Sequence, residues 1–155
     1  MINSPTSLNV TDTQPQVLWE DLQEGMALPS HSMRIDYRHA IMHVGAGRDY
    51  MPGHHNPEYA RAQGLPTVFL NTLFHQSFVD RVMTEWAGPT AVIVRRKLSM
   101  IGSICADDEI VGSGKITRIY RNDHDKKLID IDIEVRNARE VVSRAQTTLM
   151  LDKFE

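Results

Sequence analysis

The chain has 155 residues, of which 41% are hydrophobic and 24% are charged, and its formal net charge is -3. These values are typical of one globular domain with a real core, and they lack the basic field that a nucleic-acid partner requires. The single cysteine allows no intrachain disulfide. No apolar run approaches the ~20 residues that cross a bilayer, so we expect a cytoplasmic protein without membrane segments.

The first part of the chain divides into an arm and the start of a domain. Residues 1–16 are rich in Ser, Thr, Asn and Pro, and such a segment buries too little apolar surface to offset the entropy of ordering. We therefore predict a flexible N-terminal arm over 1–16 and one domain over 17–155. Trp19 would anchor the following segment. The alternating run 33–37 indicates a strand, and the small residues 45–47 indicate close approach of another backbone or a ligand.

Two helices are predicted after these small residues. Pro57 suits a first helical position and Gly64 a stop, so one short helix lies between them. Residues 67–86 then form the one long helical pattern, with apolar residues recurring every three or four positions, and Gly88 ends it. The first half of this helix is apolar almost all round, which predicts that it is buried.

The rest of the chain has the pattern of strands separated by short polar turns. The strict alternation of apolar and acidic residues in 128–135 indicates a sheet with one apolar face and one solvent-exposed face. The predicted strands are residues 91–100, 109–120, 128–135 and 141–151. We therefore predict an α+β domain in which an antiparallel sheet wraps around one long buried helix.

The most informative stretch is the loop that carries Asp49 and His54. Pro52 and Gly53 bend the chain between these two side chains, so both can face one small space and share a water molecule. A carboxylate and an imidazole arranged in this way are suited to acid/base chemistry. The alternative is that Asp49 caps a turn and that His54 and its neighbour are surface residues.

The loop resembles the signature of the MaoC-like R-specific enoyl-CoA hydratases, Asp-x-x-Pro-x-His-x-Asp-Pro-x-x-Ala. This chain has Asp49-Tyr50-Met51-Pro52-Gly53-His54-His55-Asn56-Pro57-Glu58-Tyr59-Ala60. The resemblance extends from about Met33 onward and implies a hotdog fold, with Asp49 and His54 at the family's catalytic positions. Met51 and Asn56 depart from the common asparagine and aspartate, and Phe69-Leu70 stands where single-chain hydratases have His-Gly.

A narrower resemblance is to the small catalytic hydratase subunits of bacterial steroid side-chain degradation. It implies a bulky acyl group and a second MaoC-like chain as partner. The segments that carry it are Arg48-Asp49-Tyr50, His54-His55, Ala60-Arg61-Ala62-Gln63-Gly64, Phe69-Leu70-Asn71 and Thr84-Glu85-Trp86-Ala87-Gly88-Pro89.

The resemblance implies that water is added to a 2-enoyl-CoA thioester. As a hypothesis, Asp49 and His54 both bind the water, His54 accepts its proton and Asp49 donates to C2. Backbone N–H groups near Leu70 and Asn71, at the start of the long helix, would bind the developing thioester oxyanion. Asn71 is alternatively an ordinary polar residue of a first turn. Coenzyme A enters only as part of the substrate, and we expect neither a separate cofactor nor a metal site.

Further residues are candidates for contact with the substrate. His55 and Asn56 follow the loop pair, although packing beneath the loop is the alternative for His55. Arg95 and Arg96 belong to a basic run that suits coenzyme A phosphates, with a solvated strand edge as the alternative. His75 on the long helix is expected to be a core or interface histidine.

Two other functions remain open at the level of sequence. A hotdog acyl-CoA thioesterase would place its carboxylate on or beside the long helix, but Asp80 and Glu85 lie in the later half of that helix. The second alternative is a non-catalytic subunit of a heteromeric hydratase, against which the presence of both Asp49 and His54 argues. In each case we expect at least a dimer, with an identical or a different mate, because a hotdog monomer leaves a sheet edge uncovered.

Overall fold

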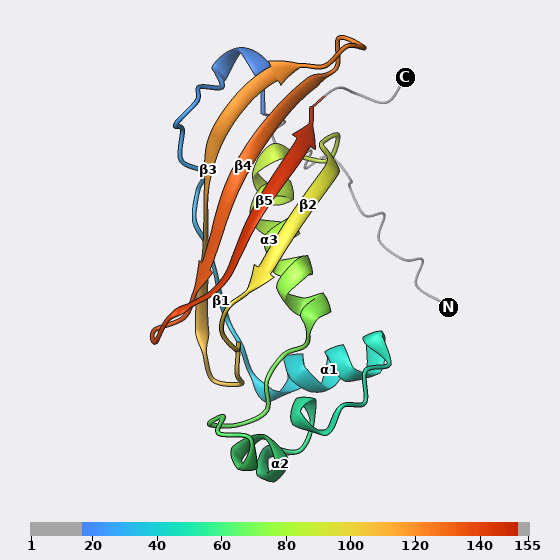
Figure 1. The fold of residues 1–155 in the computed structure, drawn as a ribbon, viewed down its shortest axis with the longest axis vertical. Helices are drawn as coiled ribbons and strands as arrows, with labels where there is room; N and C mark the ends of the chain where they lie inside the picture. Colours follow the sequence, from blue (N-terminus) through green and yellow to red (C-terminus); the bar gives the residue numbers. More distant parts are fainter. Residues whose placement is uncertain (1–16, 152–155) are drawn as a thin grey trace, which may run out of the picture.

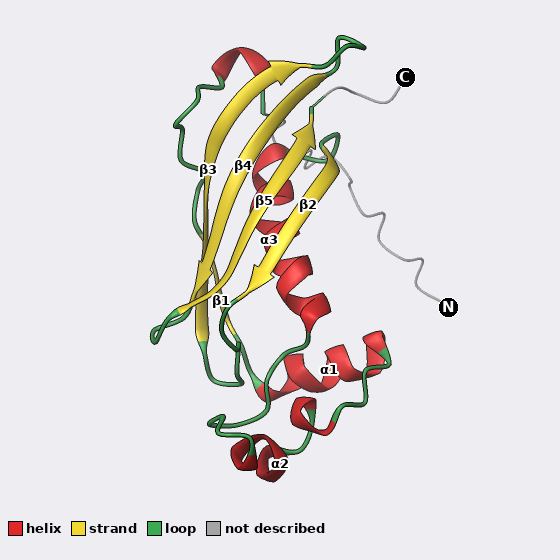
Figure 2. Ribbon diagram, viewed as in Figure 1, coloured by secondary structure: helices red, strands yellow, loops and turns green. Residues whose placement is uncertain are grey.

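The computed structural model describes residues 17–151, so the predicted arm over 1–16 lies outside the described residues. An antiparallel sheet lies against one long helix, and two shorter helices gather at one end (Figure 1, Figure 2). The elements are η1 (Trp19–Asp21), β1 (His31–Arg34), α1 (Tyr37–Gly47), η2 (Pro52–His54), α2 (Pro57–Ala62), α3 (Thr72–Ala87), β2 (Val92–Met100), β3 (Glu109–Arg121), β4 (Lys127–Arg136) and β5 (Val141–Met150).

The five strands form one sheet in the order β1-β3-β4-β5-β2, with every neighbouring pair antiparallel. The four strands predicted after residue 90 are confirmed, with ends that shift by one residue. Helix α3 lies along one face of this sheet (Figure 1). It comes very close to β3 at Gly112. A Cβ atom at Gly112 would lie 2.4 Å from Val82 of the helix, so only glycine allows this approach.

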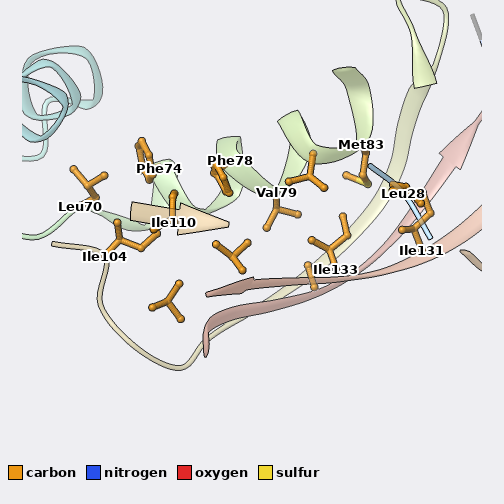
Figure 3. Packing of buried hydrophobic residues seen from close by; sticks show 14 of the residues in the cluster. Leu28, Leu70, Phe74, Phe78, Val79, Met83, Ile104, Ile110, Ile131 and Ile133 are labelled. Atoms are coloured by element: carbon orange, nitrogen blue, oxygen red, sulfur yellow. The ribbon is translucent and has the colours of Figure 1, made fainter. Parts of the chain in front are cut away.

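The core lies between α3 and the sheet, as Figure 3 shows. Alternate residues of β4 point toward the helix, and Asp132 and Arg136 on the same strand are exposed. The core cluster includes Leu70, Phe74, Phe78, Val79, Met83, Ile104, Ile110, Ile131 and Ile133. The predicted α+β arrangement is therefore confirmed.

Among the described residues, no helix is both long and apolar enough to cross a membrane.

The strand that alternation predicts ends early, and helix α1 follows it. Only residues 33 and 34 of the predicted run 33–37 lie in β1, and a helix begins at Tyr37. Asp36 caps this helix, because its Oδ1 accepts from the His39 N–H at 3.0 Å and its own N–H donates to His39 Nδ1 at 3.1 Å. The helix then buries Ala40 and Val44, spaced one turn apart.

Helix α3 begins five residues later than the periodicity predicts. Residues 67–71 lie outside any helix, and the Leu70 N–H donates to the Ile104 carbonyl at 2.8 Å. Phe69 forms an isolated β-bridge with Cys105. The predicted burial of the first half on all sides is also wrong, because Leu73 is 51% exposed. The apolar residues before Asn71 are buried by sheet-like pairing rather than by a helix.

Candidate active site

The two loop residues Asp49 and His54 lie together at the end of the molecule where α3 begins. Arg48 adopts the left-handed conformation (φ 51°) and ends α1, which turns the chain into the loop. Pro52 then starts η2, which ends at His54. His54 Nε2 lies 3.4 Å from Asp49 Oδ2. The short segment between α1 and α2 therefore brings the carboxylate and the imidazole into contact.

The imidazole of His54 is buried and held in one orientation. Its Nδ1 lies 2.8 Å from the Phe69 carbonyl oxygen. Because a carbonyl only accepts, Nδ1 carries the proton and Nε2 of the neutral ring has the free lone pair. The ring also packs edge-to-face on Phe69, with centroids 4.7 Å apart. The extended segment before α3 therefore directs the basic nitrogen of His54 toward Asp49.

The carboxylate of Asp49 is held by the residue that caps α3. Its Oδ2 accepts from Asn71 Nδ2 at 3.3 Å, and its Oδ1 accepts from the Met51 N–H at 3.4 Å. Asn71 Oδ1 in turn accepts from the Phe74 N–H at 3.1 Å. The side chain of Asp49 is 41% exposed, compared with 9% for His54. The pair thus has one buried member and one that faces solvent.

The first turn of α3 offers backbone donors next to this pair. The N–H groups of Asn71, Thr72 and Leu73 have no hydrogen-bond partner within residues 17–151, as is usual for the first residues of a helix. The prediction that Leu70 supplies such a donor is wrong, because its N–H is bonded to Ile104. The donors that remain are the N–H groups of Asn71, Thr72 and Leu73, one to three residues after Leu70.

His55 and Asn56 serve the local structure of the loop. Asn56 is the N-cap of α2, and its Oδ1 accepts from the backbone N–H groups of Glu58 at 3.0 Å and Tyr59 at 3.1 Å. His55 is exposed, with Nε2 3.3 Å from the Tyr50 carbonyl oxygen. No contact in the structure brings either side chain to the Asp49–His54 pair.

The two arginines proposed for coenzyme A phosphates lie on β2, away from the pair. Arg96 forms an ion pair with Asp80 and donates to Gln76 Oε1 at 3.3 Å. Asp80 is nine residues after Asn71, roughly 13 Å along the helix axis. Arg95 is exposed on the same strand. The structure therefore brings neither arginine together with Asp49 and His54, and the ion pair explains Arg96 without a ligand.

His75 is a core residue, as expected from the sequence. It is 1% exposed, and its Nδ1 lies 2.6 Å from Ser143 Oγ. Burial lowers the pKa of His75 to about 4. Its Nε2 is buried without a partner among the described residues.

Two parts of the site were missed at the level of sequence. One is the amide of Asn71, which holds Asp49, and the other is the carbonyl of Phe69, which orients His54. A signal for the first was present, since an asparagine three residues before a helical apolar position is a common N-cap. The role of the Phe69 carbonyl could not be recognised, because every residue has a backbone carbonyl.

No protein-family model matches the chain. The 3-oxo-4,17-pregnadiene-20-carboxyl-CoA hydratase beta subunit of Mycobacterium tuberculosis is 33% identical over 95 residues, which are 61% of this chain and 74% of the relative. The ChsH1-ChsH2 complex from the same organism has a chain with a TM-score of 0.77 and 28% identity, covering 84% of this chain and 98% of that one. A MaoC-like dehydratase from Rhodospirillum rubrum has a TM-score of 0.75 and 19% identity, covering 88% and 97%.

Proposed function

The chain belongs to the MaoC-like hydratases of the hotdog fold, and from this premise we propose that it adds water to the double bond of a 2-enoyl-CoA thioester. The observation that carries the proposal is the 3.4 Å contact of His54 Nε2 with Asp49 Oδ2, beside the unpaired backbone donors of α3. Hydration needs a base for water, an acid for C2 and donors for the thioester oxygen. All three kinds of group meet at this one place.

The geometry supports a division of labour between the two side chains. One water molecule donates its hydrogens to His54 Nε2 and Asp49 Oδ2. His54 takes a proton as the water oxygen bonds to C3, and the electron pair of the double bond moves toward the thioester carbonyl. The proton then passes from His54 across the contact to Asp49, which delivers it to C2. Atoms balance, because one hydroxyl is added to C3 and one proton to C2.

The enolate oxygen would be bound by the free N–H groups at the start of α3. Asn71, Thr72 and Leu73 direct unpaired donors out of the first turn, where the helix dipole also favours negative charge. Such preorganised donors commonly contribute a factor of about 10² to 10³ in kcat each. Helix α3 would thus position these donors and also stabilise the negative charge on the thioester oxygen.

We propose a bulky, steroid-type acyl group and a second MaoC-like chain as partner. The curated relative is a beta subunit named for a pregnadiene carboxyl-CoA ester, and a similar solved chain was crystallised in a complex. A separate chain that completes the site would leave room for an acyl group too wide for a single domain. An identical second chain is the simpler form of the same assembly.

The test is a panel of 2-enoyl-CoA esters, from a short alkyl to a steroid acyl group, assayed with and without a candidate partner chain. Hydration is followed as loss of the conjugated thioester absorbance. We expect Asp49→Asn and His54→Gln each to lower kcat by about 10² to 10⁴. Matched controls are Asp132→Asn and His124→Gln, which change exposed residues of a sheet face and a turn. Full activity in both site variants would contradict the proposal.

The two alternative functions have their own outcomes in this assay. Release of free thiol from saturated acyl-CoA without hydration would indicate a thioesterase. The carboxylates of α3 argue against a thioesterase, because both form ion pairs: Asp80 pairs with Arg96, and Glu85 pairs with Arg81 and His31. An assembled complex that keeps its activity when both Asp49 and His54 are replaced would indicate a non-catalytic subunit.

A further inference from the structure

Asp108, the residue before β3, carries a buried carboxylate that the proposed chemistry does not use. Its side chain is 6% exposed. Arg139 donates to both oxygens, to Oδ1 at 2.6 Å and to Oδ2 at 2.8 Å. Oδ2 also accepts from the Cys105 N–H at 2.9 Å and from Asn137 Nδ2 at 3.0 Å. These hydrogen bonds satisfy both oxygens, as the burial of a charge requires, and they fix the turn 105–108.

The turn 105–108 is paired with the segment that precedes α3. Phe69 and Cys105 form an antiparallel β-bridge, and Cys105 is 1% exposed. Two backbone hydrogen bonds flank this bridge: the Leu70 N–H donates to the Ile104 carbonyl at 2.8 Å, and the Ala106 N–H donates to the Val68 carbonyl at 2.9 Å. The residue whose N–H is bound by Asp108 is therefore the one opposite Phe69.

The other side of Phe69 faces the catalytic loop. Its N–H donates to the Gly53 carbonyl at 3.2 Å, and its carbonyl oxygen lies 2.8 Å from His54 Nδ1. Two residues later, Asn71 holds the carboxylate of Asp49. A displacement of the turn would thus reach both members of the pair through a single short segment.

The turn 105–108 also holds the entry to α1. The Asp107 N–H donates to the Ile35 carbonyl, and the Ile35 N–H donates to the Asp108 carbonyl, both at 2.8 Å. Ile35 precedes the N-cap of α1, and the chain enters the catalytic loop where this helix ends. Asp107 has a φ of 72°, an uncommon conformation for a residue other than glycine, so the turn depends on the contacts that hold it.

We propose that Asp108 is a positioning residue for the hydration. Its carboxylate fixes the turn through the Cys105 N–H, and the turn fixes the Phe69 carbonyl that orients His54. The proposal rests on the function proposed above and adds to it a residue that acts through His54. Without the carboxylate, the Cys105 N–H is buried without an acceptor, which favours movement of the turn. The His54 ring then loses its fixed orientation, and small misplacements of a catalytic group are costly.

The kinetic test compares Asp108→Ala with Asp108→Asn on a 2-enoyl-CoA ester that the wild type hydrates. Asparagine keeps an oxygen for the Cys105 N–H, and Arg139, which is 49% exposed, can turn to solvent. We expect Asp108→Ala to lower kcat per folded molecule at least about tenfold with little change in KM, and Asp108→Asn to recover most of this loss. If the ion pair only stabilises the fold, kcat per folded molecule stays at the wild-type value in both variants, and the proposal is overturned.

The tautomer of His54 reports the orientation of its ring without turnover. Nitrogen NMR of isotope-labelled histidine measures it at a pH where the ring is neutral, and His54→Gln identifies the signals. In the wild type the proton lies on Nδ1, because the Phe69 carbonyl accepts it. We expect Asp108→Ala to populate the tautomer protonated at Nε2, and Asp108→Asn to resemble the wild type. A wild-type tautomer in Asp108→Ala would overturn the proposal.

The matched control is Asp80→Ala, which also removes a carboxylate from an ion pair with an arginine, but in the later half of α3. It should lower the melting temperature and leave kcat and the tautomer of His54 unchanged. A change of the tautomer in this control as large as in Asp108→Ala would mean that any loss of an ion pair loosens the ring, and the positioning role would fail.

A double variant, Asp108→Leu with Arg139→Met, takes the place of Asp108→Ala if that protein does not fold. Apolar residues of similar volume commonly replace a buried ion pair without loss of stability, and neither one offers an acceptor to the Cys105 N–H. The double variant should therefore melt close to the wild type but show the lower kcat and the altered tautomer. Either quantity at its wild-type value overturns the proposal.

The two readouts separate this proposal from the function on which it rests. If the wild type hydrates no ester of the panel, but the tautomer changes in Asp108→Ala and not in Asp80→Ala, Asp108 positions His54 and the hydratase function fails. If the wild type hydrates an ester, and Asp108→Ala has the kcat and the tautomer of the wild type, only the positioning role fails.

Discussion

Gly53 stands between the two catalytic candidates because its neighbour leaves no room for a side chain. A Cβ atom there would lie 2.4 Å from the ring of Phe69. His54 packs on this ring, and the backbone carbonyl of Phe69 orients the His54 imidazole. We predict that Gly53→Ala displaces this ring or the turn and lowers kcat at least about tenfold, since small misplacements of a catalytic group are costly. Steady-state kinetics measures the effect.

Gly45 provides the control for this change. It lies on α1, where a Cβ would meet nothing within 4 Å. Gly45→Ala should therefore leave kcat unchanged and raise the free energy of unfolding by up to about 1 kcal/mol, because alanine is the better helix former. If Gly53→Ala retained full kcat, the Phe69 ring would not be needed to place His54.

His75 makes the stability of the fold depend on pH. Burial lowers the pKa of His75 from 6.5 to about 4, so the unfolded chain binds this proton at a higher pH than the folded one. The free energy of unfolding should therefore fall as pH drops from about 6.5 to about 4, and below that this contribution is constant. At about 1.4 kcal/mol per unit, the loss is of the order of a few kcal/mol.

Urea unfolding of the wild type and of His75→Leu at pH 7 and pH 5 measures this contribution. The variant should lose less stability between the two values, although its absolute stability also changes because Ser143 loses its partner. Other groups titrate in the same range, and the difference between the two proteins isolates His75. Equal losses would mean that the imidazole is protonated in the folded core.

At the scale of the elements, Asn71 joins the start of α3 to the site. Its Oδ1 caps the helix and its Nδ2 holds Asp49. We predict that Asn71→Asp keeps the cap but loses the donor and sets a second carboxylate beside Asp49, so kcat falls while thermal stability stays close to that of the wild type. Asn71→Ala should lose both functions, with about 1 kcal/mol of the free energy of unfolding.

Thermal melts and kinetics on the same two variants separate the roles of Asn71. A drop in kcat shared by both variants, with a drop in melting temperature only in Asn71→Ala, is the expected result. Unchanged kcat in Asn71→Asp would mean that Asp49 is positioned by the Met51 N–H alone.

Elements whose local signals agree with their tertiary surroundings were predictable from sequence. The four later strands alternate as their two faces require, and α2 has an asparagine cap, a proline at its first position and a terminating glycine. Helix α1 was missed because alternation in 33–37 outweighed the Asp36 cap and the spacing of Ala40 and Val44. The Asp36 cap could be recognised in the sequence. The sequence did not show that this cap outweighs the alternation of residues 33–37.

The site was predictable as a pair of residues but not as an arrangement. Asp49 and His54 are close in sequence, so a bent loop suffices to bring them together. Asn71 and the Phe69 carbonyl reach the pair through the antiparallel contact of the segment before α3 with Ile104 and Cys105. That contact joins residues about 35 positions apart and cannot be derived from local patterns. For the same reason, Leu70 was assigned as a free donor.

At the scale of the whole molecule, residues 17–151 leave one long edge of the sheet open. Strand β2 pairs only with β5, so its other side presents unpaired backbone groups among the described residues. Val94 on this strand is 56% exposed, at the irregularity where the register with β5 shifts. An open edge of this length that carries an exposed apolar side chain favours association with another strand. We expect the partner chain, identical or different, to extend the sheet there.

A charge at this edge tests the expected association. Val94→Lys places an ammonium group where the neighbouring strand would lie, and we predict that it weakens assembly at least about tenfold, because lysine at an edge opposes strand pairing. Sedimentation velocity over a range of concentrations measures the dissociation constant. Ser113→Lys is the control, since it adds the same charge to an exposed position of β3, an interior strand of the sheet. If Ser113→Lys weakened assembly and Val94→Lys did not, the partner would lie on the outer face of the sheet instead of its edge.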